Sequence, residues 1–466
     1  MSILAGFMVP HPPMIVPDIG KGSEAQVQKT IDAYERVAGE ITELRPDTIV
    51  ITSPHSIMYA DYFHISPGRG ALGSFADFMA PQVNFSEDYD EELVGEICRL
   101  AEAEKFPAGT MGEKEPRLDH GTMVPLWFIR NRYKEGKIVR IGLSGLPLAD
   151  HYRLGQLIKQ AAEDTGRRTV IVASGDLSHK LQDYGPYGYV PEGPVYDERI
   201  MDVMGRAAFG ELLDFESTFC DKAAECGHRS FVIMAGAFDG ISVKAESLSH
   251  EDVTGVGYGI CTFYPDEGEA KEESGDRRFL DEWIRKMREK LSTERGESDD
   301  YVRFARAAVE ACVLGQDEIA MDDELPGEMT TEQAGTFVSI HKYGELRGCM
   351  GTIGPTRSCI ADEIASNAVS AAMRDPRFPP IQPDELEWLE INVDVLGEPE
   401  DIDSIDELDV KKYGVIVTSG GKRGLLLPDL DGIDTPEQQV DIAKKKAGIY
   451  GFEKVSLQRF EVIRHR

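Results

Sequence analysis

Four of the ten histidines of this chain stand beside strand-like apolar runs in its first half. His11 and His55 each follow such a run and lie next to prolines, His179 follows a third run, and His120 precedes an apolar run. Ligands of open α/β sheets bind beyond the carboxyl ends of the strands. Imidazoles gathered there hold a metal or move protons, so the four side chains predict a metal-dependent site.

A mononuclear iron(II) site that activates dioxygen uses two histidines and one carboxylate. His11 and His55 are the first two predicted ligands, because the neighbouring prolines stiffen their loops and lower the entropy cost of holding a ligand. The third is expected at Glu225, a hard carboxylate, or at Cys226, a soft thiolate that favours copper(I) or zinc unless it is simply a small buried hydrophobe. Glu225 is favoured, but the sequence leaves the choice open.

The other residues of this set have expected roles in proton transfer and substrate binding. His179 is predicted to be the general acid/base, since the unperturbed pKa of imidazole lies nearest neutrality. Asp176 is expected to orient His179 or share its proton, or else, with equal weight, to be the N-cap of a turn. His120 is expected to hydrogen-bond substrate or bound oxygen, and His228 is a weaker candidate for a supporting contact.

Composition limits the classes of protein to which the chain can belong. Its 466 residues predict two or three domains, and 41% apolar residues suit a soluble globular protein. A formal net charge of -33 argues against nucleic acid or an anionic membrane as a partner. Seven scattered cysteines without CxxC spacing predict reduced thiols. With no signal peptide or membrane span recognised, a cytoplasmic protein is expected.

A charged stretch at residues 265–279 predicts a linker between domains 1–264 and 280–466. Strand and helix patterns alternate before it, which predicts an α/β domain with a mostly parallel sheet and helices on both faces. Its strands are expected at 3–9, 48–52, 138–143, 169–173, 243–249 and 256–264. Its helices are expected at 23–44, with Ser23 as N-cap, and at 91–103, 154–164, 196–213 and 231–238.

After the linker, helices and strands are grouped rather than alternating, which predicts an α+β domain. Helices are expected at 279–291, 299–314, 359–373 and 436–447, the last with Thr435 as N-cap and Pro436 in its first turn. Strands are expected at 336–341, 391–396, 415–418 and 455–463.

The histidine motifs, including Val9-Pro10-His11-Pro12-Pro13 and Ser174-Gly175-Asp176-Leu177-Ser178-His179, resemble the LigB-type class III extradiol dioxygenases and the Memo-type proteins that share their fold. The resemblance covers about residues 1–264. It implies iron(II) on His11, His55 and Glu225, with His179 as acid/base in the ring cleavage of a catechol-like substrate. The cysteine after Glu225 is similar to the one that Memo-type proteins carry near their metal site.

Leu346-Arg347-Gly348-Cys349-Met350-Gly351 is the most distinctive run after the linker. Arg347 beside the thiol would lower its pKa and bind a carboxylate or phosphate, so Cys349 is a candidate nucleophile or radical relay. The alternative, favoured on the residues alone, is a tight turn just past a strand with a buried structural cysteine.

The chain resembles the AMMECR family over about residues 280–466. The resemblance rests on this run, on Arg374-Asp375-Pro376-Arg377-Phe378 and on Gly424-Leu425-Leu426-Leu427-Pro428. The resemblance implies a two-lobed α+β fold with a cleft beside the cysteine-bearing loop. Memo-like and AMMECR-like modules occur with a radical SAM protein in the AmmeMemoRadiSam system, and the chain resembles a fusion of the two.

Two functions follow as hypotheses. The first is a metal-dependent oxidoreductase, with iron(II) expected and zinc or copper as alternatives, acting on a small aromatic substrate. The second is a non-dioxygenase or scaffold component that docks a radical SAM partner. A homo-oligomer is compatible with either.

Overall fold

The computed structural model describes residues 1–266, 278–316, 319, 325–430, 432–450 and 454–466. The chain divides into two compact units, Met1–Ile284 and Arg285–Arg466. The linker predicted at 265–279 falls mainly outside the described residues, so the domain limits drawn around it stay predictions. Each helix of the described ranges is too short or too polar to cross a bilayer.

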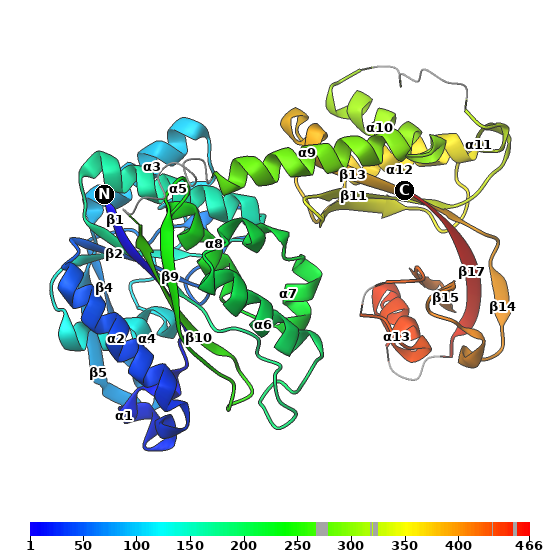
Figure 1. Cartoon of the computed structure of the whole chain (residues 1–466). Coiled ribbons are helices and arrows are strands. Elements are labelled where there is room, and N and C mark those ends of the chain that lie inside the picture. Colours follow the sequence, from blue (N-terminus) through cyan, green and yellow to red (C-terminus); the bar gives the residue numbers. More distant parts are fainter. Residues whose placement is uncertain (267–277, 317–318, 320–324, 431, 451–453) are drawn as a thin grey trace. The chain divides into compact units, whose positions relative to one another are not determined.

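A six-stranded sheet forms the centre of the first unit (Figure 1). Its strands are β1 (Ile3–Val9), β2 (Thr48–Ser53), β7 (Lys137–Gly142), β8 (Thr169–Ser174), β9 (Val243–Glu251) and β10 (Tyr258–Pro265). They lie in the order β7-β2-β8-β1-β10-β9. The first four run parallel, and β10 and β9 are antiparallel additions at one edge. The predicted α/β domain with a mostly parallel sheet is confirmed.

Helices cover both faces of this sheet. They are α1 (Pro17–Gly20), α2 (Gln28–Leu44), α3 (Glu91–Glu104), α4 (His120–Arg132), α5 (Leu148–Thr165), α6 (Glu192–Gly205), α7 (Ser217–Ala223) and α8 (His228–Ala237). Successive residues of a strand point to opposite faces. Phe7 of β1 accordingly lies in the core shared with α2 and α4, whereas a Cβ on Gly6 would touch Met234 of α8.

Two sequence predictions for the first unit need correction. The helix expected from Ser23 begins at Gln28, because residues 23–27 form a 3-10 turn in which the Ser23 hydroxyl donates to the Gly20 carbonyl. The helix expected at 196–213 ends at Gly205, since Ala207 adopts a left-handed φ of 50° that a helix cannot contain. Four strands were not anticipated: β3 (Phe63–His64), β4 (Gly70–Phe75), β5 (Ala80–Asp88) and β6 (Ala108–Gly109).

A curled antiparallel sheet forms the second unit (Figure 1). Its strands are β11 (Thr336–Lys342), β12 (Glu345–Gly351), β13 (Leu389–Leu396), β14 (Glu400–Ile402), β15 (Tyr413–Ser419), β16 (Lys422–Leu426) and β17 (Ser456–His465). The order is β12-β11-β13-β17-β15-β16, with β14 paired to β17. The helices are α9 (Phe279–Glu297), which begins in the first unit, α10 (Asp300–Val313), α11 (Gly327–Thr331), α12 (Ile360–Met373) and α13 (Pro436–Ala447).

The second unit is α+β, as predicted, and has the two lobes that the AMMECR resemblance implies. In one, α10 and α12 pack on the sheet, and alternate strand residues such as Val338 and Val393 are buried beneath them. In the other, α13 covers β15 and β16. The Thr435 side chain accepts a hydrogen bond from the Gln438 N–H, which confirms the predicted N-cap. Cys349 lies within β12 rather than in a turn past a strand, which corrects that expectation.

Candidate functional site

Three candidate residues of the first unit lie at equivalent places beyond neighbouring parallel strands. Val9 of β1 is paired with Ser174 of β8, and the β2–β8 register brings Ser53 to the same level. His11, His55 and Asp176 each come two residues after this row. Because the carboxyl ends of parallel strands share one edge of the sheet, the three side chains converge there.

Two histidines and one cysteine form a cluster of possible metal ligands. The Nε2 atoms of His11 and His55 are 3.0 Å apart, and the Cys226 Sγ lies 3.6 Å from the His11 Nε2. The three ligand atoms all lie within 4.8 Å of one another. His11 is buried and His55 is exposed, so the cluster is anchored in the core and open on the side of His55.

Ser174 sets the tautomer of His11. The Ser174 hydroxyl donates its single proton to the Gly121 carbonyl at 2.6 Å and also lies 3.0 Å from the His11 Nδ1. It can therefore only accept there, which places the imidazole proton on Nδ1. The lone pair of the neutral ring is then on Nε2, directed at His55 and Cys226. Burial lowers the pKa of His11 to about 3 and keeps the ring neutral.

Of the adjacent pair that the sequence left open, Cys226 faces the histidines and Glu225 does not. The Glu225 carboxylate accepts the backbone N–H of His228 at 2.6 Å, at the start of α8. The Asp176 N–H donates to the Cys226 sulfur at 3.3 Å. Gly175 and Gly227 permit this contact between two loops, because a Cβ on Gly175 would lie 2.0 Å from the Gly227 Cα.

Asp176 and His179 lie on the Cys226 side of the cluster. Asp176 accepts the His11 backbone N–H at 2.8 Å, and no helix begins at it, so it links two loops rather than capping a turn. Burial raises the pKa of this carboxyl to about 6. Ligand atoms of Asp176, His179 and Cys226 lie within 4.8 Å of one another. The buried His179 Nε2 has no hydrogen-bond partner among the described residues.

His120 lies beside His55 and lines an adjoining cavity. The two ring centroids are 4.0 Å apart, and His120 begins α4 after the N-cap Asp119. Burial lowers the pKa of His120 to about 3, with further lowering by the neighbouring imidazoles. The cavity measures about 790 Å³ and reaches both histidines, and Phe78, Leu118 and Met123 supply apolar walls.

The donor atoms fit a bound transition-metal ion. At ligand distances of about 2.1 Å for nitrogen and 2.3 Å for sulfur and a tetrahedral angle, ligand atoms lie about 3.4–3.6 Å apart. The separations of 3.0 and 3.6 Å around His11 Nε2 are of this size. The His179 Nε2, which has no hydrogen-bond partner in the described part of the chain, also suits a site completed by a bound group. The observed ligand set, two histidine nitrogens and one cysteine sulfur, differs from the two histidines and one carboxylate that the sequence analysis favoured.

Two further residues contribute to the site, and the sequence analysis gave neither a role. Ser174 orients His11, and Asp119 accepts the Ser53 hydroxyl at 2.6 Å while capping α4. Ser174 opens a quoted motif at a strand end, and Asp119 directly precedes His120; these positions were the available signal. His228 is instead a core residue, with its ring bound to the Leu212 carbonyl and the Tyr196 hydroxyl.

The two candidate residues of the second unit, Cys349 and Arg347, lie on the same strand but have different surroundings. Cys349 lines a cavity and receives a hydrogen bond from the Ser339 hydroxyl at 3.3 Å. The Arg347 guanidinium instead binds both carboxylate oxygens of Glu385 at 3.0 and 2.9 Å. Arg347 therefore takes part in a partly buried ion pair, and it is absent from the lining of the cavity.

Comparisons with known proteins find relatives along the chain. Residues 5–261 match the family model of the catalytic LigB subunit of aromatic ring-opening dioxygenase, and residues 302–465 match the AMMECR1 model. A protein of Clostridium acetobutylicum is 38% identical over 474 residues, with 100% of each chain covered. A protein of Thermotoga maritima is 49% identical over 168 residues, which are 36% of this chain and 97% of that protein.

Among solved structures, protein PH0010 from Pyrococcus horikoshii is 29% identical and covers 35% of this chain and 88% of its own, with a TM-score of 0.33.

Proposed function

The chain belongs to the family of the catalytic LigB subunit of aromatic ring-opening dioxygenase and carries an AMMECR1 segment after it, and on this premise we propose that its first unit is a metal-dependent enzyme of the extradiol-dioxygenase superfamily. The observation that carries the proposal is the convergence of His11 Nε2, His55 Nε2 and Cys226 Sγ. His11 supports it further, because its tautomer leaves Nε2 free to bind an ion.

The proposed ligands are His11, His55 and Cys226. Iron(II) is the proposed ion, since it supports the dioxygen chemistry typical of the family, and zinc and copper(I) are the alternatives that a thiolate ligand favours. When bound, the ion supplies a Lewis acid and a redox centre for a substrate beside it. The second unit has no part in this proposal.

The proposed substrate is a small aromatic or phenolic molecule in the cavity of about 790 Å³. Pockets of this size hold drug-sized ligands, and Phe78 and Leu118 offer apolar contacts to a ring. His120 is proposed to hydrogen-bond the substrate or oxygen. His179 is proposed to accept and return a phenolic proton, and Asp176 to hold the His11 and Cys226 loops in place.

Metal content tests the site directly. Protein purified without oxygen is loaded with iron(II), and retained iron is measured for wild type, His11→Ala, His55→Ala, Cys226→Ser and Glu225→Gln. We expect the first three variants to lose iron and Glu225→Gln, which keeps an acceptor for the His228 N–H, to retain it. Equal retention in all five proteins would overturn the site. Oxygen uptake with a panel of catechols then tests the reaction, and none by iron-loaded wild type argues against a dioxygenase.

A second function is favoured by one observation, the thiol of Cys226 among the proposed ligands instead of a carboxylate. In this alternative the first unit is a non-dioxygenase or scaffold component that works with a radical SAM partner. It predicts a stable complex with such a protein in cells and no oxygen uptake. Affinity purification under anaerobic conditions tests it, and the absence of a partner would count against it.

A further inference from the structure

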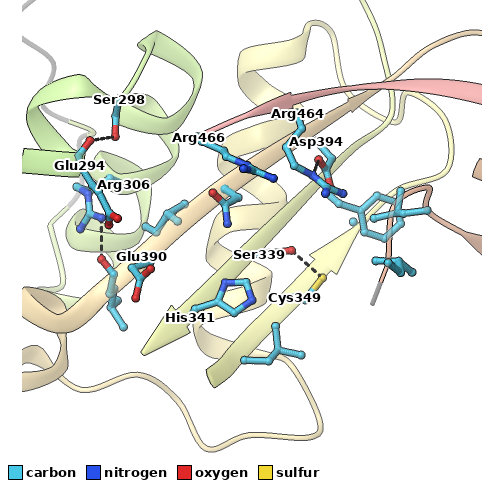
Figure 2. A pocket seen from close by; sticks show the side chains of 18 of the residues that line it. Glu294, Ser298, Arg306, Ser339, His341, Cys349, Glu390, Asp394, Arg464 and Arg466 are labelled. Carbon is cyan, nitrogen blue, oxygen red and sulfur yellow. Dashed lines mark hydrogen bonds and ion pairs between the residues drawn. The ribbon is translucent and has the colours of Figure 1, made fainter. Parts of the chain in front are cut away.

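The second unit contains a cavity of about 1140 Å³ that the proposed metal site does not use. Its floor is the sheet face opposite α10 and α12, and α13 and the β16 region of the other lobe supply further lining residues. Figure 2 shows Ser339, His341 and Cys349 on the strands of this floor, with Arg464 and Asp394 beyond them. The volume is ample for a small organic ligand.

Strand register places three polar side chains in one row of this floor. Cys349 of β12 is paired with Ser339 of β11, and Ser339 with Asn392 of β13. Residues paired across neighbouring strands have their side chains on one face, and all three line the cavity. The intervening Val338 and Val393 point into the core on the other face. The side-chain amide of Asn392 forms no hydrogen bond within the described part of the chain. Its N–H donors and its oxygen acceptor are therefore available to a ligand.

The cavity is lined by six basic and four acidic side chains, so its lining carries a small excess of positive charge in a chain whose net charge is -33. The guanidinium of Arg464 is bound to Asp394, and that of Arg377 to Asp375. Lys446 of α13 lines the same cavity, yet it has no hydrogen bond or ion pair with any residue that the structure describes.

The Lys446 ammonium interacts electrostatically with Cys349 and Arg377, and desolvation lowers its pKa although part of the side chain stays exposed. A cation that is unpaired within the described ranges and lies near the Arg377 guanidinium is an attractive site for an anion. The floor that adjoins it carries a thiol and a free amide, so an anion held there would place the rest of its molecule over Cys349.

We propose that this cavity binds a small organic anion, a carboxylate or a phosphate, whose acidic group pairs with Lys446 and whose body lies against Cys349 and Asn392. Apolar residues such as Phe337 and Leu427 complete the cavity and suit a ligand with an apolar part. The site is independent of the metal centre proposed for the first unit. The cation of this site is Lys446 and not Arg347, whose guanidinium is already bound by Glu385. Lys446 follows Cys349 by almost a hundred residues along the chain.

Alkylation of Cys349 measures such a site without knowledge of its natural ligand. Iodoacetate is an anion and iodoacetamide is neutral, and both form a bond between Sγ and carbon while iodide leaves. The rate at Cys349 is followed in the full chain by peptide mass spectrometry for both reagents. The ratio of the two rates reports binding of the negative charge, because any change in thiol reactivity alters both rates alike.

We expect Lys446→Met to lower the iodoacetate-to-iodoacetamide ratio at Cys349 by about fivefold, the effect of one close charge near a protein surface. Lys445→Met, on the same helix but outside the cavity lining, is the matched control and should leave the ratio within about twofold of wild type. Cys312 of α10 in the same sample should show no change. An unaltered ratio in Lys446→Met, with both rates reduced together, would overturn the proposal.

Competition in wild type tests the site even where a variant fails to fold. Inorganic phosphate or acetate is added at constant ionic strength, balanced with chloride, and should slow iodoacetate alkylation at Cys349 in a saturable way. Stronger protection by phosphate identifies a phosphate site, and stronger protection by acetate a carboxylate site. Absence of protection by both ions would contradict the proposal.

Discussion

The first unit gathers its candidate groups at the ends of parallel strands, whereas the second lays them across the face of an antiparallel sheet. His11, His55 and Asp176 each follow a strand by two residues, so chain topology alone brings them together. Cys349, Ser339 and Asn392 meet only through strand register, and Lys446 joins them from another lobe. Sites of the first kind are visible in the sequence as repeated motifs, and sites of the second kind are not.

The largest effect should come from disturbing how two strand-end loops meet in the first unit. A Cβ on Gly175 would lie 2.0 Å from the Gly227 Cα, so Gly175→Ala must push the Cys226 loop away from His11. We expect loss of bound metal although no proposed ligand is changed, with destabilisation of about 1–3 kcal/mol from overpacking. Metal analysis and denaturant unfolding measure the two effects.

Gly39→Ala is the control for that substitution. Gly39 lies inside α2, and a Cβ there meets no atom of the described residues within 4 Å. It should keep metal and gain about 0.5–1 kcal/mol of stability, because alanine is the better helix former. If Gly175→Ala retains metal as Gly39→Ala does, the Cys226 loop does not need the Gly175–Gly227 contact. The idea that the loops after the strands assemble the site would then be wrong.

A smaller effect is expected from changing the tautomer of His11 without moving a ligand. Ser174→Ala removes the acceptor that keeps the imidazole proton on Nδ1. Loss of such a supporting hydrogen bond typically lowers metal affinity about 10–100-fold, and competition with a chelator measures it. Ser230→Ala is the matched control, since the buried Ser230 hydroxyl has no hydrogen-bond partner in the described residues. Equal affinity in both variants would exclude the orienting role of Ser174.

The sequence predicted where in the fold the first site lies, but not which residue is its third ligand. The apolar runs predicted strand ends at residues 9, 52 and 173, within one residue of the observed ends at Val9, Ser53 and Ser174, and the histidines beyond them were recognisable. Glu225 and Cys226 are adjacent in an irregular segment where Ala224 adopts a left-handed φ of 54°. Which of the two points at His11 depends on that backbone and on the Gly175–Gly227 contact, neither of which has a periodic signal.

In the second unit the elements were easier to predict than the site. Glycines around Cys349 suggested a turn, but they lie inside β12, where a Cβ on Gly348 would come within 2.3 Å of the Ala371 carbonyl of α12. Gly348 therefore marks close packing of a helix on the strand, whereas a Cβ on Gly351 would meet Phe337 of the neighbouring strand β11. Sequence neighbourhood also suggested Arg347 as the cation near the thiol, whereas the cavity is lined by Lys446. Long-range register and lobe packing decide both points.

The pH dependence of the second unit tests how firmly β12 is held. The Asp375 carboxylate accepts the Cys349 N–H at 2.9 Å and binds Arg377, and the guanidinium holds the pKa of Asp375 well below its usual range. A depressed carboxyl pKa stabilises the fold above the unfolded-state pKa of about 4, and this stabilisation is lost as the pH falls through the folded-state value.

We therefore expect Asp375→Asn to destabilise the second unit by about 1–3 kcal/mol at pH 7, with a difference from wild type that shrinks as the pH falls below about 4. Hydrogen exchange of β12 peptides, corrected for intrinsic rates, measures the opening. Asp441→Asn on α13 is an exposed control. A difference that is constant with pH would show that the Asp375 charge does not hold the strand.

The smallest expected effect is on the alkylation ratio at Cys349, and it tests whether a cation acts there because it is adjacent in the sequence or because it is close in space. Arg347→Met removes the cation next to Cys349 along the chain but leaves the cavity lining intact, since Arg347 pairs with Glu385 elsewhere. We expect destabilisation of about 1–3 kcal/mol from the broken, partly buried pair, yet an iodoacetate-to-iodoacetamide ratio at Cys349 within about twofold of wild type. Denaturant unfolding and alkylation kinetics measure the two. A ratio that falls as far in Arg347→Met as in Lys446→Met would return the anion site to the neighbouring arginine and remove the contrast between the two units.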